Sequence, residues 1–76
     1  MNITELENKL NMLKISTGLY SIMIGGLPNE KLCIVHEETW QVYYSERGRK
    51  TGLKEFKTET EACEYFLEKL KRYADE

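Results

Sequence analysis

The segment near the end of the chain, residues 58 to 73, restricts the fold more than any other part of the sequence. It opens with TETE, a capping box in which Thr58 and Glu61 each satisfy a backbone N–H at the start of a helix. Apolar residues then recur at helical spacing, and they are Ala62, Cys63, Phe66, Leu67, Leu70 and Tyr73. This pattern predicts an amphipathic helix, which needs another element on which to bury its apolar face.

A second amphipathic helix is predicted over residues 2 to 15. Its apolar positions are spaced by three and four residues, and they are Ile3, Leu6, Leu10 and Leu13. Asn2 is the expected N-cap with Glu5 in the capping-box position, and a register two residues later is an alternative. Gly18 is expected to end the helical pattern.

The segments between the two helices have the β-branched and aromatic bias of strands. We predict strands over residues 19–24, 31–37 and 39–46, with 53–57 as a short fourth strand or an extended lead-in to the last helix. The turn-forming residues of GGLPNE separate the first two strands. The simplest packing of these elements is an antiparallel meander.

The third strand alternates cleanly between two sets of side chains. One face carries Trp40, Val42 and Tyr44, and the other carries Gln41, Tyr43 and Ser45. We therefore expect one buried face and one solvent-exposed face. The predicted fold is α+β in the order α-β-β-β-(β)-α, with a three- or four-stranded sheet and both helices packed on one face.

Length and composition limit what this fold can contain. Seventy-six residues form one small domain, residues 1–76, with a single thin core and no deep cleft. The apolar fraction of 41% and the charged fraction of 32% are typical of a soluble globular protein rather than a disordered one. The longest apolar run, SIMIGGL, is too short to cross a membrane, and MNITELENKL is not a secretory signal. The expected location is the cytoplasm, with no membrane contact.

No set of residues predicts catalysis or a cofactor. Cys33 and Cys63 have no CxxC spacing and His36 is the one histidine, which argues against a zinc site. Both cysteines are expected to be free and buried, although a bridge between the second strand and the last helix stays open. His36 is expected at the surface or rim, and Ser45 has no surrounding G-x-S-x-G. The sequence therefore predicts a protein that is not an enzyme and holds no metal.

The charge distribution singles out residues 46–57, ERGRKTGLKEFK. This segment has a net charge of +3 on a chain of net charge −2, so the remaining residues sum to −5. It is interpreted as a plain hairpin turn, a loop that docks an acidic protein patch, or a nucleic-acid-binding loop; nucleic acid is the least favoured. The candidate partner-binding residues are Tyr43, Arg47, Arg49, Lys50 and Lys54. Tyr43 is the candidate anchor on the exposed face, and ordinary cross-strand packing with Val35 is the alternative interpretation.

The order of elements is similar to that of the double-stranded RNA-binding domain. That family places a lysine-rich motif at the start of its last helix and recognises the shape of the RNA minor groove. In this chain the corresponding segment is KTETEACEYF, where Glu59, Glu61 and Glu64 would repel phosphates. The resemblance implies a nucleic-acid-binding module that uses the basic loop 46–57 and the neighbouring tyrosines, but the acidic segment argues against RNA.

A second resemblance is to small bacterial domains that share the pieces YSI, GGLPNE, W-Q-VYYSERG and F-K-T-E-T-EACEYF. Some such proteins are similar to the immunity partners of bacterial toxins. This resemblance implies a stoichiometric protein-binding role without a cofactor, as an immunity or accessory protein. An exposed strand edge leaves two oligomeric states open, a monomer or an edge-paired dimer.

Overall fold

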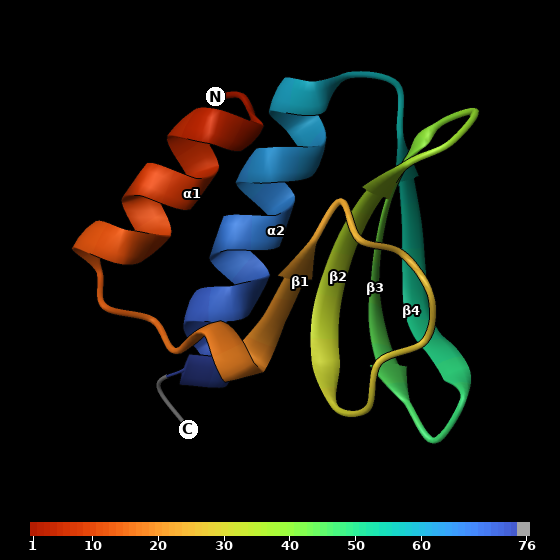
Figure 1. Cartoon of the computed structure of the whole chain (residues 1–76). Helices are drawn as coiled ribbons and strands as arrows, with labels where there is room; N and C mark the ends of the chain where they lie inside the picture. The colour runs from red at the N-terminus through yellow and green to blue at the C-terminus, as the bar shows by residue number, and fades with distance from the viewer. Residues whose placement is uncertain (75–76) are drawn as a thin grey trace.

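Two helices and a four-stranded sheet make up the structure, a computed structural model that describes residues 1–74 (Figure 1). The elements are α1 (Ile3–Met12), a 3₁₀ turn (Thr17–Leu19), β1 (Tyr20–Ile22), β2 (Lys31–His36), β3 (Trp40–Glu46), β4 (Arg49–Phe56) and α2 (Glu59–Ala74). The predicted α+β class and the packing of the helices on the sheet are confirmed. Neither helix is long and apolar enough to cross a membrane, within the part of the chain that the structure describes.

Both helices begin at the residues that the sequence predicts. The Asn2 side chain accepts a hydrogen bond from the Glu5 N–H at 2.8 Å, and the Glu5 carboxylate accepts from the Asn2 N–H at 3.1 Å. The Thr58 hydroxyl oxygen accepts from the Glu61 N–H at 3.2 Å. The Glu59 carboxylate also accepts from the first backbone N–H of α1 at 2.7 Å, so one hydrogen bond joins the starts of the two helices.

Helix α1 ends earlier than predicted, and Gly18 is not its terminator. The chain turns at Lys14, which has a left-handed φ of 57°. The Lys14 N–H donates to the Asn11 carbonyl and the Ile15 N–H donates to the Leu10 carbonyl, both at 3.1 Å. These two bonds form a Schellman motif, which stops the helix although the residue in the left-handed position is not glycine.

The sheet has the strand order β1-β2-β3-β4 and is mixed. Strands β2, β3 and β4 pair antiparallel as predicted, but β1 runs parallel to β2, with Tyr20 opposite Leu32. The prediction of a fully antiparallel meander is therefore wrong for β1. A parallel neighbour requires the chain to return from the end of β1 to the end of the sheet where β1 began. Because β1 has only three residues, this distance is short, and the eight residues of the 23–30 loop, which can extend over about 26 Å, are enough to span it.

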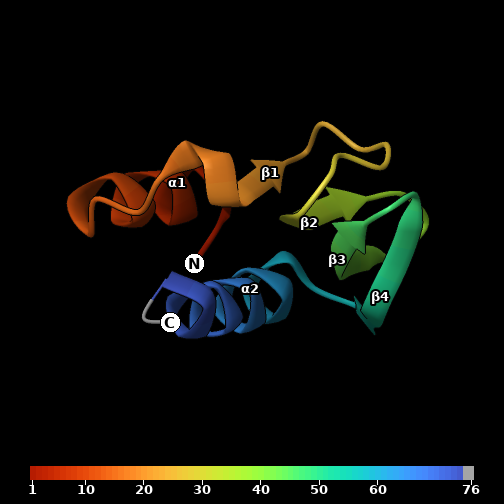
Figure 2. The same ribbon diagram turned by 90° about the horizontal axis from the view of Figure 1, so that it is seen from below.

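The main core lies between the sheet and the helices (Figure 2). Helix α2 packs on the sheet, and α1 packs against α2 beside β1. The buried residues of this core are Leu6, Leu10, Leu32, Ile34, Val42, Ala62, Cys63, Phe66, Leu67 and Leu70. Trp40 and Tyr44 are partly buried against the same core, so the predicted face of β3 is confirmed.

Strand β4 is longer than the predicted 53–57 segment and contains a β-bulge. Ser45 lies opposite Lys50, but Val42 lies opposite Lys54, which leaves one extra residue on β4. Gly52 lies in this irregular part with a φ of +63°, a conformation that glycine adopts without strain. The bulge changes which face of the sheet the following residues occupy.

Candidate functional site

The candidate site is built on the turn between β3 and β4. Arg47 and Gly48 connect the paired residues Glu46 and Arg49, and both have positive φ values, 50° and 75°. A two-residue hairpin loop needs this backbone because it matches the twist of the strands. The Arg47 N–H also donates to the Asn29 side chain at 3.4 Å. The turn is thus the predicted hairpin, and it holds the Arg47 side chain at the end of the sheet.

The four predicted cations are all exposed, but they do not share one face. Lys50 lies opposite Ser45, on the face of the sheet away from the helices. Lys54 lies opposite Val42, whose side chain is part of the helix-side core, because the bulge shifts the alternation by one residue. Arg47 is at the turn. These residues therefore surround β4 and do not form a flat basic patch.

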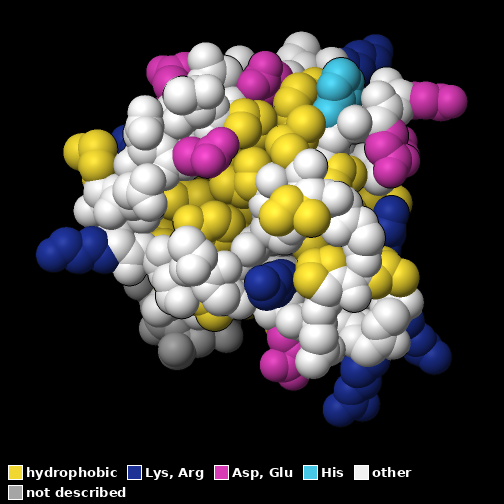
Figure 3. All heavy atoms as spheres, in the orientation of Figure 1, with side chains coloured by type: hydrophobic (Ala, Val, Ile, Leu, Met, Phe, Trp, Pro, Cys, Tyr) yellow, Lys and Arg dark blue, Asp and Glu magenta, His cyan; other side chains and the backbone are white. Residues whose placement is uncertain are grey.

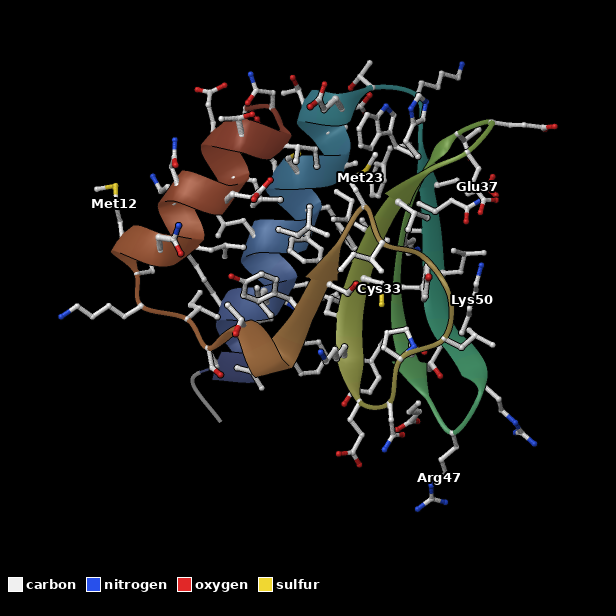
Figure 4. The ribbon with its side chains drawn as sticks, viewed as in Figure 1. Met12, Met23, Cys33, Glu37, Arg47 and Lys50 are labelled. Atoms are coloured by element: carbon white, nitrogen blue, oxygen red, sulfur yellow. The ribbon has the colours of Figure 1, made fainter. Side chains whose placement is uncertain are left out.

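Arg47 and Glu37 lie at opposite ends of the sheet (Figure 4). Arg47 extends from the β3–β4 turn at one end, whereas Glu37 lies at the opposite end, beside the β2–β3 turn. Lys50 projects from β4 between these two ends. The starts of both helices carry further carboxylates, Glu5 and Glu59 among them. The β3–β4 turn also carries the Glu46 carboxylate, opposite Arg49, so cations outnumber carboxylates there without excluding them.

Tyr43 is not on an exposed face, so its prediction as a surface anchor is wrong. Its side chain is only 1% exposed because the 23–30 loop crosses that face of the sheet (Figure 1). The Tyr43 hydroxyl donates to the Gly26 carbonyl at 2.9 Å. Tyr43 thus binds the middle of the loop to the sheet.

The loop closes a small second core on this face, formed by Cys33, Val35 and Tyr43. Burial is the main cause that raises the pKa of the Tyr43 phenol, so the hydroxyl keeps the proton that it donates to Gly26. The Lys50 ammonium lies 4.6 Å from the centre of the Tyr43 ring, a cation–π contact. Lys50 therefore covers the side of this core that faces β4.

The two cysteines are free and lie on opposite faces of the sheet. Cys33 belongs to the loop-side core and Cys63 to the helix-side core, so no bridge joins them. Burial raises the pKa of the Cys33 thiol. Burial, with the nearby Glu59 carboxylate, raises that of Cys63 from 9.0 to about 11. Both thiols are protonated at neutral pH, which makes them poor nucleophiles and poor metal ligands.

The other candidate groups are packed or scattered. The His36 ring is stacked on Trp40 with centroids 4.3 Å apart, and it lies at the surface as predicted. The Tyr44 ring is stacked on Tyr73 at 5.2 Å. Across residues 1–74, no group of three or more His, Cys, Asp or Glu side chains is placed to hold a metal ion.

Exposed apolar side chains on the 23–30 loop and on β4 were not anticipated from the sequence, and those of the loop are spread along it, with Met23 at the end of the molecule away from Arg47 (Figure 4). Met23, Ile24 and Leu27 of the loop are 46%, 82% and 49% exposed, and Leu53 of β4 is 44% exposed. Figure 3 shows apolar surface on the loop side of the molecule, with Lys and Arg side chains at its lower edge. The run SIMIGGL contains the three loop residues, but it was interpreted as strand and turn.

Comparison with protein-family models, with curated proteins and with solved structures gave no match.

Proposed function

We propose that this protein acts without catalysis, by binding another protein through the β3–β4 hairpin. The observation that carries the proposal is the exposure of Arg47, Arg49, Lys50 and Lys54 around one strand of a chain whose remaining residues are acidic. Complementary charge steers association and selects a partner with an acidic surface patch. Leu53, which is exposed on β4 between Lys50 and Lys54, adds apolar contact area of the kind that such an interface needs.

The specific role that we propose is that of a bacterial immunity or accessory protein. Its support is the resemblance of GGLPNE, VYYSERG and EACEYF to small bacterial domains, together with the exposed cations of the hairpin. An immunity protein binds its toxin stoichiometrically, so this role needs no cofactor. It predicts that a gene for a large toxin lies next to the gene for this chain.

The test compares two charge-reversal variants of equal net charge. In the first, Arg47, Arg49 and Lys50 are each changed to Glu; in the control, Lys9, Lys14 and Lys71, which are exposed outside the hairpin, are each changed to Glu. Each tagged protein is incubated with lysate of the source organism, and the captured proteins are quantified by mass spectrometry. We expect one partner to be captured in equimolar amount by the unmodified chain and the control variant, and lost from the hairpin variant.

Nucleic-acid binding is the competing hypothesis. It requires the cations of the hairpin to contact phosphates and the neighbouring tyrosines to stack on bases. Tyr43 is buried and Tyr44 is stacked on Tyr73, so neither ring is free to stack on a base. Filter binding of the same three proteins to single- and double-stranded RNA and DNA at low salt separates the two functions. Binding that is lost from the hairpin variant and weakens steeply with salt would favour nucleic acid over protein.

A further inference from the structure

Strand β4 presents a long free edge. The strand order leaves β4 with β3 as its one neighbour in the sheet, and seven of its eight residues are exposed, all except Phe56. Figure 1 shows β4 at the side of the sheet farthest from α1. The other edge strand, β1, has three residues and lies beside α1. Backbone N–H and C=O groups on the outer side of β4 are therefore available to a partner strand.

The cations flank this edge on both faces. Lys50 lies on the loop side of the sheet, and Lys54 lies on the helix side because of the bulge at Gly52. Arg49 lies opposite Glu46 and next to the turn. A flat acidic surface can meet one of these faces but not both. Two adjacent acidic residues of an extended strand point to opposite faces, so a strand reaches cations on both sides.

The charge of β4 also indicates whether its free edge pairs with a second copy of this chain or with a different protein. Residues 49–56 carry Arg49, Lys50 and Lys54 against Glu55. Edge pairing of two copies would place cations next to cations, and the bulge would interrupt the ladder; both features protect sheet edges from self-association. The same cations favour an acidic strand. Leu53 is exposed between Lys50 and Lys54. It can contact an apolar residue that lies between the acidic residues of the partner strand.

We infer that the partner binds by adding an acidic, extended segment to the free edge of β4 as a fifth strand. This inference rests on the proposed function and specifies its mode, in which backbone hydrogen bonds supply affinity and the flanking cations supply selectivity. The edge-paired dimer is the alternative that the charge of β4 disfavours.

The test uses synthetic peptides and ¹⁵N-labelled protein. The probe is a peptide of alternating Val and Thr that carries two pairs of adjacent Glu. Its matched control has the same sequence with alternate backbone amides N-methylated, which removes donors and preserves charge. We expect the probe to shift the amide signals of residues 49–56 and to slow their hydrogen exchange, and the N-methylated peptide to bind about tenfold more weakly through the loss of one or two hydrogen bonds.

The outcomes separate the binding mode from the proposed function. Equal binding of the two peptides, or shifts outside residues 49–56, would overturn strand addition while the capture experiment could still support protein binding. Absence of binding by the probe at low salt would also overturn it. The hairpin variant with Arg47, Arg49 and Lys50 changed to Glu should not bind the probe, whereas the control variant with Lys9, Lys14 and Lys71 changed should bind it as the unmodified chain does.

Discussion

The two faces of the sheet are covered by different kinds of structure. The helix side is covered by α2, whose Phe66 and Leu70 side chains are fully buried in a core that also includes residues of α1. The loop side is covered by residues 23–30, and its core has three members, Cys33, Val35 and Tyr43. A long regular element thus covers one face, whereas an irregular loop covers the other and is held by separate hydrogen bonds, among them the bond from Tyr43 to Gly26.

This difference leaves the edge of the sheet as the place where we propose that a partner binds. Because the loop occupies the face that carries Tyr43, no open face of the sheet is left for a partner around this residue. The exposed cations then lie around β4, with Lys50 and Lys54 on opposite faces. Substitutions on the two faces should therefore change the stability of the chain by different amounts.

The largest effect is expected on the helix side, for Phe66→Ala. Removing a fully buried ring leaves a cavity against α1 and the sheet, so the free energy of unfolding should fall by about 3–5 kcal/mol. Urea unfolding followed by circular dichroism measures it. A loss below about 1 kcal/mol would show that the helix-side core does not carry the fold.

The next effect is a pH dependence caused by Cys63 on the helix side. Its pKa is raised from 9.0 to about 11, so the unfolded chain loses the thiol proton at lower pH than the folded chain does. Stability contributed by this group is therefore present below pH 9 and lost between pH 9 and 11, by about 2–3 kcal/mol. Urea unfolding of the unmodified chain and of Cys63→Ala across this range isolates it. Parallel pH profiles for the two proteins would contradict the assignment.

A smaller effect is expected on the loop side, for Tyr43→Phe. The change removes the hydrogen bond to the Gly26 carbonyl and keeps the ring, so the free energy of unfolding should fall by about 1 kcal/mol. Native-state hydrogen exchange should speed up in residues 23–30 and stay unchanged in α2. Faster exchange in α2 as well would mean that the two faces open together.

The smallest effect is a gain in stability, expected for Lys14→Gly at the end of α1. Lys14 has a left-handed φ of 57°, which glycine adopts more readily than lysine, so the variant should be more stable by about 0.5–1 kcal/mol. Thermal unfolding by calorimetry measures the change. A loss of stability would show that the Schellman motif depends on the lysine side chain.

The elements that could be predicted are those specified by nearby residues. Asn2 with Glu5, and Thr58 with Glu61, fix the helix starts within three residues of sequence. The alternation of β3 correctly assigned Trp40, Val42 and Tyr44 to the helix side. The end of α1 was missed because a Schellman motif was expected at a glycine, whereas the chain places Lys14 there.

The burial of Tyr43 could not be read from its own strand. It depends on a hydrogen bond to Gly26, 17 residues earlier in the chain, and on the parallel direction of β1, which only the three-dimensional structure shows. The separation of Lys50 from Lys54 had a local signal in Gly52, but alternation without a bulge places both on one face. The candidate cations could therefore be predicted, but not their arrangement around an edge.

The most direct test of the account is the capture experiment with the two charge-reversal variants. The hairpin variant changes Arg47, Arg49 and Lys50 to Glu, and the control makes the same charge change at Lys9, Lys14 and Lys71. If the exposed cations of the hairpin bind the partner, the control recovers it at the level of the unmodified chain and the hairpin variant recovers none above background. Equal recovery by the two variants would contradict the assignment of the binding surface to the hairpin.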